Sequence, residues 1–163
     1  MLKIGMIGAG FVATFHERAL RSVRNAELAG VCALKGAETL AQKARQDHLG
    51  DTKVYGTIAE LVKAVDVVCV FAPNFVRVDM MRQIAAAVED GTRIKGIIVE
   101  KPLARNYAEA ETLARIAKAM GVPTAYFENQ IHMPSVVQAR TQLTQVEKAM
   151  GAPHLARSAE EHG

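Results

Sequence analysis

The feature that most constrains the fold is a regular alternation of short apolar segments with helix-like segments. The predicted strands cover residues 2–7, 27–34, 52–56, 66–73, 93–99 and 123–127. Several of them are apolar throughout instead of alternating with polar residues, which indicates burial on both faces by flanking helices. Strands of this kind in a strand–helix repeat are typical of a doubly wound, parallel α/β sheet. We therefore expect one such domain over residues 1–127.

Two of the predicted helices carry clear positional signals. In the first, apolar residues recur at about every fourth position, which predicts one buried face; they are Phe11, Phe15, Ala19 and Val23. In a later helix, Asn106 precedes Glu109 by three residues, the spacing of a reciprocal cap between side chains and backbone. Gly121 and Pro123 are the expected stop signal of that helix.

The pattern changes after residue 127. A helix with several Gln and Thr residues is expected over residues 134–150, ended by Gly151 and Pro153. Residues 154–163 then begin like another strand. We therefore expect residues 128–163 to form a connecting helix and the first strand of a second, α+β domain that is truncated in this chain.

Composition limits the class of protein. Of the 163 residues, 50% are hydrophobic and 23% are charged, which is typical of a soluble globular chain with one core. The net charge is only +3, and no dense Lys/Arg run contains interleaved aromatic residues, so we expect no nucleic-acid partner. No apolar run approaches the roughly 20 residues that span a bilayer, so no membrane association is expected. Cys32 and Cys69 lie in apolar runs without a CxxC pair, which predicts no metal site and reduced thiols in a cytoplasmic protein.

A glycine-rich turn follows the first predicted strand. Gly8, Gly10 and Ala13 match the GxGxxA form of the dinucleotide fingerprint. Gly8 permits the tight turn, Gly10 leaves room for a pyrophosphate, and the small Ala13 lets the helix approach the strand. The amides of Phe11 and Val12 would then face the phosphates at the positive end of the helix. Because the motif lies between a strand and a helix, it predicts dinucleotide binding rather than a simple turn.

The residues after the second strand bear on the choice of nucleotide. The fingerprint normally has an acidic residue there that binds the ribose hydroxyls, but this chain has Ala33, Leu34 and Lys35. A carboxylate would repel a 2′-phosphate, whereas Lys35 can pair with one. The sequence therefore predicts NADP or NAD, with a preference for NADP. The alternative, that Lys35 is only a solvated loop residue, stays open.

Two short segments follow the fourth and fifth strands. They contain Ala72, Pro73 and Asn74 in the first and Glu100 and Lys101 in the second. In an open α/β sheet, ligands bind outside the carboxyl ends of the strands, so both segments are expected beside the cofactor.

Lys101 is the candidate catalytic residue of this edge. A lysine beside a positively charged nicotinamide ring has a lowered pKa and can exchange a proton with a substrate hydroxyl or orient it. Lys101-Pro102 is also a candidate cis peptide bond, since only X–Pro bonds adopt cis readily. The structural alternative is that Glu100 and Lys101 form only a salt-bridged strand end. His16 is interpreted as a hydrogen-bonding residue at a helix terminus.

With these motifs, the chain resembles the Gfo/Idh/MocA oxidoreductases over nearly its whole length. The resemblance rests on IGMIGAGFVATFHERAL, VYGTIAELVK, DVVCVFAPN, IIVEKPLARN and ENQIHMPSVVQA. It implies a nicotinamide-dependent dehydrogenase that acts on the CH–OH groups of sugars, polyols or related compounds. It further implies that Glu100 and Lys101 flank the nicotinamide and that Asn129 lies near the substrate side. Arg77 replaces a histidine of many members, which puts the local cofactor contacts in question.

The resemblance also implies parts that lie beyond these residues. Family members complete the substrate site with a second, mostly antiparallel domain that supplies an Asp and a His, and they usually associate through its sheet. We therefore expect a homo-oligomer for a full-length protein and no turnover by this fragment alone. The alternative function is a non-catalytic dinucleotide-binding module, such as a redox sensor or a partner-binding protein.

Overall fold

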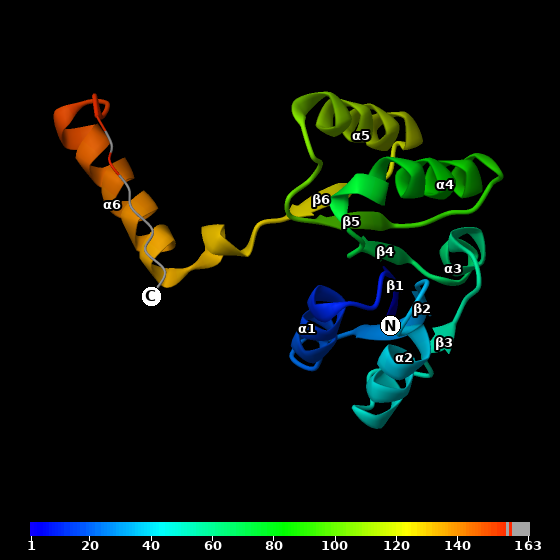
Figure 1. The fold of residues 1–163 in the computed structure, drawn as a ribbon. Helices are drawn as coiled ribbons and strands as arrows, with labels where there is room; N and C mark the ends of the chain where they lie inside the picture. The colour runs from blue at the N-terminus through cyan, green and yellow to red at the C-terminus, as the bar shows by residue number, and fades with distance from the viewer. Residues whose placement is uncertain (156, 158–163) are drawn as a thin grey trace. The chain divides into compact units, whose positions relative to one another are not determined.

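A six-stranded sheet organises the chain in the computed structural model, which describes residues 1–155 and 157 (Figure 1). The strands are β1 (Leu2–Ile7), β2 (Ala26–Cys32), β3 (Lys53–Val54), β4 (Val67–Val70), β5 (Gly96–Glu100) and β6 (Thr124–Phe127). Their order is β3-β2-β1-β4-β5-β6, and every neighbouring pair is parallel. The chain winds outward from β1 to β3, crosses back to β4 and winds the other way. The carboxyl ends of β1 and β4 therefore meet at the switch point, where such sheets bind ligands.

Helices cover both faces of the sheet, which confirms the predicted doubly wound architecture. They are α1 (Phe11–Leu20), α2 (Ala37–Gln46), α3 (Ile58–Ala64), α4 (Arg77–Glu89) and α5 (Tyr107–Met120), with a 3-10 turn η1 (Asn74–Val76) before α4. The first two lie on one face and the next three on the other (Figure 1). In β4, Val67 and Cys69 join the core under α1 and α2, whereas Val68 and Val70 join the opposite core.

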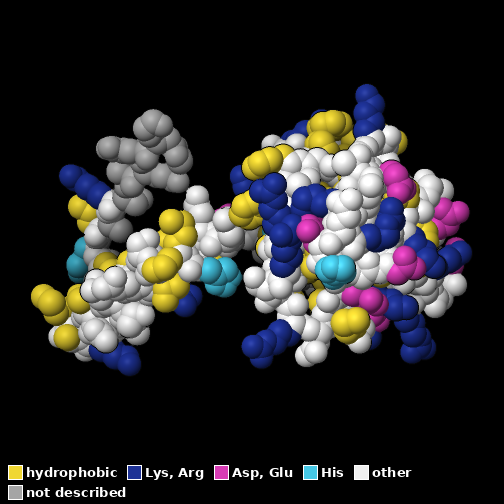
Figure 2. Space-filling model, turned by 90° about the horizontal axis from the view of Figure 1, so that it is seen from below, with side chains coloured by type: hydrophobic (Ala, Val, Ile, Leu, Met, Phe, Trp, Pro, Cys, Tyr) yellow, Lys and Arg dark blue, Asp and Glu magenta, His cyan; other side chains and the backbone are white. Residues whose placement is uncertain are grey.

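Residues Glu128–Gly163 form a second compact unit, separate from Met1–Phe127. It contains a 3-10 turn η2 (Asn129–His132) and the helix α6 (Pro134–Met150), which has the predicted bounds. Figure 2 shows hydrophobic side chains on the surface of this unit; those exposed along α6 are Val136, Val137, Leu143, Val146 and Met150. The strand expected within residues 154–163 falls largely outside the described residues. Among the helices of the described chain, none is both long and apolar enough to cross a lipid bilayer.

The predicted buried face of α1 is wrong. Phe11 is 85% exposed and Phe15 is 58% exposed, and neither Ala19 nor Val23 is buried. The buried residues of α1 are Ala13 and Glu17 instead. The helix begins directly at the glycine turn and lies close to the sheet, so a small side chain fits there and a phenyl ring does not.

The buried Glu17 has its own explanation. Its carboxylate pairs with the ammonium of Lys43 from α2, and Lys43 also lies 3.2 Å from Asp47. One Glu17 oxygen, Oε1, has no hydrogen-bond partner, and the guanidinium of Arg21 lies 4.0 Å from it. Burial of this carboxylate therefore depends on the ion pair between α1 and α2.

The predicted cap of α5 is half formed. The side chain of Asn106 accepts a hydrogen bond from the backbone N–H of Glu109 at 3.0 Å. The carboxylate of Glu109 does not return to Asn106; it accepts from the backbone N–H of Arg105 at 3.1 Å and pairs with the guanidinium of the same residue. A complete reciprocal cap is present at α3, between Thr57 and Glu60.

Candidate functional site

The glycine turn connects β1 to α1 and contains two glycines in different surroundings. Gly8 has a φ of 107°, and a Cβ atom there would lie 3.0 Å from the backbone nitrogen of Ala72. Only glycine fits such a backbone conformation without strain. At Gly10, a Cβ atom would meet nothing within 4 Å. The outer side of the turn is therefore open at Gly10, as a close approach of pyrophosphate would require.

The N-terminus of α1 is suited to an anion. Gly10 is its N-cap residue, no side chain caps the helix, and its first turn contains no acidic residue. The backbone amides of Phe11 and Val12 lie at this positive end of the helix. Ala13 is fully buried where α1 contacts the sheet. These positions agree with the predicted roles, which remain predictions.

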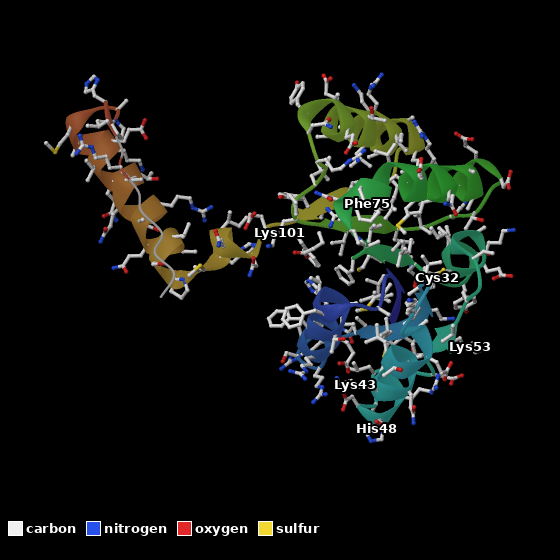
Figure 3. The ribbon with its side chains drawn as sticks, in the orientation of Figure 1. Cys32, Lys43, His48, Lys53, Phe75 and Lys101 are labelled. Carbon is white, nitrogen blue, oxygen red and sulfur yellow. The ribbon has the colours of Figure 1, made fainter. Side chains whose placement is uncertain are left out.

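A cleft of about 530 Å³ lies at the carboxyl ends of β1, β2 and β4. Of the predicted cofactor residues, Gly8, Ala33, Lys35, Ala72 and Pro73 line it. Cys32 and Phe75, labelled in Figure 3, belong to the same lining. The cleft thus begins beside the glycine turn and extends past the end of β2, the path that an extended dinucleotide would follow.

The end of β2 carries no acid into this cleft. The strand ends at Cys32, and the next three residues are the half-buried Ala33, the fully exposed Leu34 and the exposed Lys35. The first carboxylate after them is Glu38, which lies 2.8 Å from the guanidinium of Arg45. Among the residues that line the cleft, Lys35 is therefore the charged group beside the end of β2.

Both cysteines are buried and unpaired. Burial raises the pKa of the Cys69 thiol to about 12, and burial together with the nearby charge of Glu60 raises the pKa of the Cys32 thiol. Both thiols are therefore protonated at neutral pH, which makes them poor nucleophiles.

Glu100 and Lys101 lie at the carboxyl end of β5. Glu100 is the last strand residue and is 8% exposed, whereas Lys101 is exposed at the same edge (Figure 3). The Lys101-Pro102 peptide bond is cis, as predicted. The side chain that faces the carboxylate of Glu100 is not that of Lys101 but that of His16 of α1, whose Nε2 lies 3.1 Å from the Oε2 of Glu100. Among the described residues, Lys101 has no ion-pair partner.

His16 is not a helix-terminus residue, contrary to our prediction. It lies within α1, and its ring stacks against those of Phe71 and Phe127 at centroid distances of 4.4 and 4.7 Å. Phe71 follows β4 and Phe127 ends β6, so the three rings join α1 to two strands. Sequence reasoning missed the pairing of His16 with Glu100 because 84 residues separate them.

Arg77 is the second residue whose role the sequence did not reveal. It is 3% exposed and donates to the backbone carbonyls of Glu100, Pro102 and Leu103, and also to that of Ala72 at 3.0 Å. Burial lowers the pKa of Arg77, and the nearby Glu100 partly opposes this shift. Arg77 thus fixes the two segments that follow β4 and β5. The partners of its guanidinium are backbone oxygens, so Arg77 holds the loops together, and the expected difference in local cofactor contacts stays a prediction.

Several predicted cofactor residues are not among those that line the cleft: Gly10, Phe11, Val12, Ala13, Asn74, Glu100, Lys101 and Asn129. Asn74 opens η1 directly after Pro73. Asn129 opens η2 and belongs to the second unit, so its predicted place near the substrate remains a prediction.

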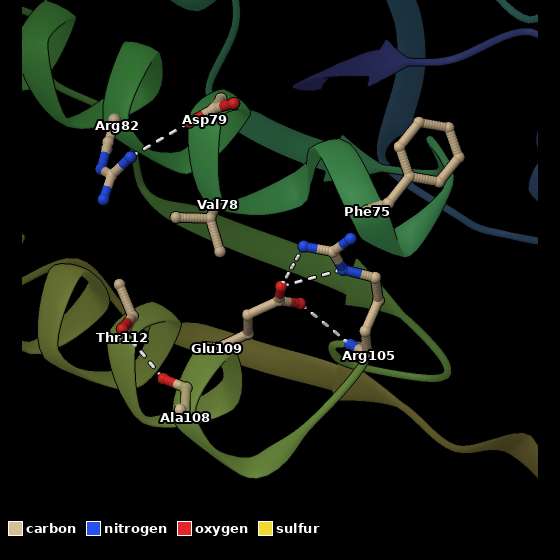
Figure 4. Close-up of a pocket in the computed structure, with 8 residues that line it drawn as sticks. All are labelled: Phe75, Val78, Asp79, Arg82, Arg105, Ala108, Glu109 and Thr112. Carbon is tan, nitrogen blue, oxygen red and sulfur yellow. Dashed lines mark hydrogen bonds and ion pairs between the residues drawn. The ribbon is translucent and has the colours of Figure 1, made fainter.

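A smaller cleft of about 320 Å³ between α4 and α5 contains charged side chains but none of the predicted site residues (Figure 4). Its two arginines are already paired within short distances along the chain. Arg82 lies 3.1 Å from Asp79, and Arg105 pairs with Glu109. We therefore assign the functional site to the larger cleft and the adjoining end of β5.

The parallel sheet, the glycine turn and the cleft at the switch point together define a dinucleotide-binding domain of the Rossmann type. Comparison with known proteins specifies it further. Residues 2–127 match the profile of GFO_IDH_MocA, described as an oxidoreductase family with an NAD-binding Rossmann fold. The chain therefore belongs to the Gfo/Idh/MocA family of oxidoreductases.

Individual relatives match this chain along a limited part of their own length. Glucose-6-phosphate 3-dehydrogenase of Bacillus subtilis (strain 168) is 32% identical over 124 residues, which are 75% of this chain and 32% of that protein. An NAD binding oxidoreductase from Klebsiella pneumoniae has a TM-score of 0.71 and 27% identity, covering 90% of this chain and 39% of the other. GenD2 from gentamicin A biosynthesis, solved in complex with NAD, has a TM-score of 0.74 and 25% identity, covering 90% and 40%. The chain thus spans about a third of the length of the curated relative.

Proposed function

We propose that this chain is the cofactor-binding part of an NAD(P)-dependent dehydrogenase or reductase that acts on a CH–OH group of a sugar, polyol or related compound. The observation that carries the proposal is the cleft at the switch point, which is lined by Gly8 and Ala9 of the glycine turn, in a chain of this family. The name of the Bacillus subtilis relative, a sugar phosphate dehydrogenase, supports the substrate class.

The chain's own residues supply binding and positioning. The amides of Phe11 and Val12 would hold the pyrophosphate, with Gly10 leaving room for it. Ala72 and Pro73 would line the dinucleotide. The bound nicotinamide supplies the hydride chemistry, which the side chains of this chain do not perform themselves. The exposed ammonium of Lys101, free of ion-pair partners among the described residues, would hold or exchange the hydroxyl proton of the substrate.

Fluorescence titration of the 163-residue chain with NADPH and NADH tests cofactor binding directly. We expect saturable binding of at least one nucleotide and loss of binding in Gly10→Val, because the added side chain fills the open side of the turn. Failure of the unchanged chain to bind either nucleotide contradicts the proposal.

The preference for NADP rests on Lys35 and on the lack of an acid at the end of β2. We expect NADPH to bind more tightly than NADH, and Lys35→Glu to weaken NADPH selectively by about ten-fold or more, because a carboxylate repels the 2′-phosphate. Lys35→Gln is the matched control of similar length without charge. Clearly tighter binding of NADH by the unchanged chain contradicts the preference.

The catalytic role of Lys101 requires a protein that also carries a substrate domain. In such a protein, Lys101→Ala should lower kcat by about 100-fold or more, as expected when a positioned acid–base group is lost. Lys101→Arg keeps the positive charge but does not readily release a proton. It therefore tests whether the reaction requires proton exchange or only the charge. Undiminished turnover in Lys101→Ala would mean that the lysine is structural.

A second candidate function is a dinucleotide-binding module without turnover, such as a redox sensor. The match over residues 2–127 concerns the NAD-binding Rossmann fold, which both functions would share. Sequencing the reading frame around this segment discriminates between the two functions. A following segment with the Asp and His expected from the family supports the enzyme, for which we also propose a homo-oligomer.

A further inference from the structure

We propose that His16 is a positioning residue that holds the Glu100 carboxylate in place, so that its negative charge favours the oxidised cofactor over the reduced one. The inference rests on the proposed function, because it requires the nicotinamide to lie at the carboxyl end of β5. His16 belongs neither to the glycine turn nor to the Glu-Lys-Pro segment.

The ring of His16 is fixed by its neighbours. Its plane lies within 5° of the plane of Phe71 and within 9° of the plane of Phe127, so both phenyl rings stack on the imidazole. The centroids of the two phenyl rings are 6.3 Å apart, which is too close for the imidazole to lie sandwiched between them. The edge of the imidazole is left for polar contacts. The Nε2 atom on that edge lies 3.1 Å from the Oε2 of Glu100, within hydrogen-bonding distance.

Glu100 is held from two sides. His16 contacts its carboxylate, and Arg77 donates to its backbone carbonyl. The side chain of Glu100 is 11% exposed, so water cannot fully replace a lost protein donor. A carboxylate at such a site keeps one orientation only if a donor faces it. The edge of the His16 ring lies in the place of that donor.

A fixed carboxylate distinguishes the two redox forms of the cofactor. The nicotinamide ring is positively charged when oxidised and neutral when reduced. A negative charge held near the ring attracts the oxidised form and has no net charge to attract in the reduced form. A carboxylate that rotates away or becomes protonated loses this discrimination, so the preference depends on the donor that holds it.

Two variants separate the hydrogen bond from the ring stack. His16→Phe keeps an aromatic ring against Phe71 and Phe127 but removes the donor. His16→Gln keeps a side-chain N–H but removes the ring. Binding of NADP⁺ and NADPH by the 163-residue chain is then measured at one pH, with NADPH followed by fluorescence and NADP⁺ by competition.

We expect His16→Phe to lower the ratio of Kd(NADPH) to Kd(NADP⁺) by about three- to ten-fold, the range of one charge-assisted hydrogen bond. Glu100→Gln should lower the ratio in the same direction, and the double variant should lower it no further. His16→Gln should lower the ratio less than His16→Phe does, because it keeps a side-chain N–H. It should lower the melting temperature more, because it lacks the aromatic ring. If His16 only stabilises the fold, His16→Phe should weaken the binding of NADP⁺ and NADPH equally. That result overturns the inference.

A second measurement needs no cofactor. The ¹⁵N NMR spectrum of the ligand-free chain, with His16 assigned by its absence in His16→Phe, should show a protonated Nε2 whose shift changes in Glu100→Gln. An unprotonated Nε2 cannot donate to a carboxylate and overturns the inference. If the unchanged chain binds neither nucleotide, the proposed function fails and this inference fails with it. Intact binding with an unchanged ratio overturns the inference alone.

Discussion

Gly8 and Gly10 lie two residues apart in one turn, yet their backbones and surroundings differ. Gly8 combines a φ of 107° with backbone atoms of the β4 end 3.0 Å from the place of a Cβ atom. Gly10 has a φ of −81° and open space where its Cβ would lie. The fold therefore requires the first glycine, whereas the second leaves the open space that the proposed ligand would use.

Substitution by alanine should separate these two tasks. We expect Gly8→Ala to lower the free energy of unfolding by about 1–3 kcal/mol, because the residue would be strained and in contact with backbone. Gly10→Ala should change it by less than about 0.5 kcal/mol and weaken nucleotide binding instead. Urea unfolding and fluorescence titration of both variants check the prediction. Equal stability losses in the two variants would contradict it.

At this scale the sequence predicted the residues whose tasks are local and missed those whose partners are remote. The tasks of Gly8 and Gly10 follow from a motif of six residues. The partners of Arg77 include carbonyls 23 to 26 residues further along the chain, and His16 pairs with a residue 84 positions away. No local pattern contains those contacts, because they exist only once the strands are neighbours.

At the scale of the elements, apolar runs located the strands well, but periodicity failed for α1. A four-residue repeat indicates that a helix has an apolar face and does not indicate what covers it. In α1 that repeat coincides with the exposed Phe11 and Phe15, while a small residue and a paired carboxylate face the sheet. Because α1 begins close to the sheet, the small Ala13 is buried there and the larger phenyl rings are not.

The packing of α1 leads to a contrast between two neighbouring positions. Phe11→Ala should change the free energy of unfolding by less than about 0.5 kcal/mol, since the phenyl ring is 85% exposed. Ala13→Leu should lower it by about 1–3 kcal/mol, because the site is fully buried and has no room for a larger side chain. Chemical denaturation of both variants at one pH measures the two effects. A larger loss for Phe11→Ala would restore the predicted buried face.

Asp66 joins three strands at the amino end of the sheet. Its carboxylate lies 2.9 Å from the ammonium of Lys95 and accepts from the backbone N–H of Lys3 at 2.8 Å. Its own N–H donates to the carbonyl of Lys3, and its carbonyl accepts from the N–H of Lys95. The hydrogen bonds from Lys95 and Lys3 lower the pKa of Asp66. One side chain thus connects the starts of β1, β4 and β5.

This arrangement predicts a pH dependence of stability. The folded-state pKa of Asp66 lies below its unfolded value of about 3.9, so its contribution is complete well above that pH and is lost as pH falls through the lower, folded-state pKa. Asp66→Asn should lower the free energy of unfolding at pH 7 by up to about 1 kcal/mol, the usual ceiling for partly exposed pairs. The gap in the free energy of unfolding between the unchanged protein and Asp66→Asn should close in acid. Urea titrations at neutral and acidic pH measure it, and a gap that widens in acid would contradict the prediction.

At the scale of the whole molecule, both hydrophobic cores lie within Met1–Phe127. The residues of α6 contribute to neither core. We therefore expect a protein of residues 1–127 to unfold cooperatively, with the same denaturation midpoint as the 163-residue chain and with retained nucleotide binding. Circular dichroism and fluorescence titration of both lengths check this. A lower midpoint in the shorter protein would show that the second unit stabilises the first.

His16 and Glu100 lie 84 positions apart in the chain, so the ribosome makes them at different times. Ribosomes add roughly 5–20 residues per second, so about 4 to 17 s pass between the synthesis of the histidine and that of its carboxylate. During that interval the glycine turn exists without the end of β5, and β1 lacks β4 as its second neighbour. A nucleotide can therefore stabilise the nascent chain through the complete proposed site only after β5 has been made.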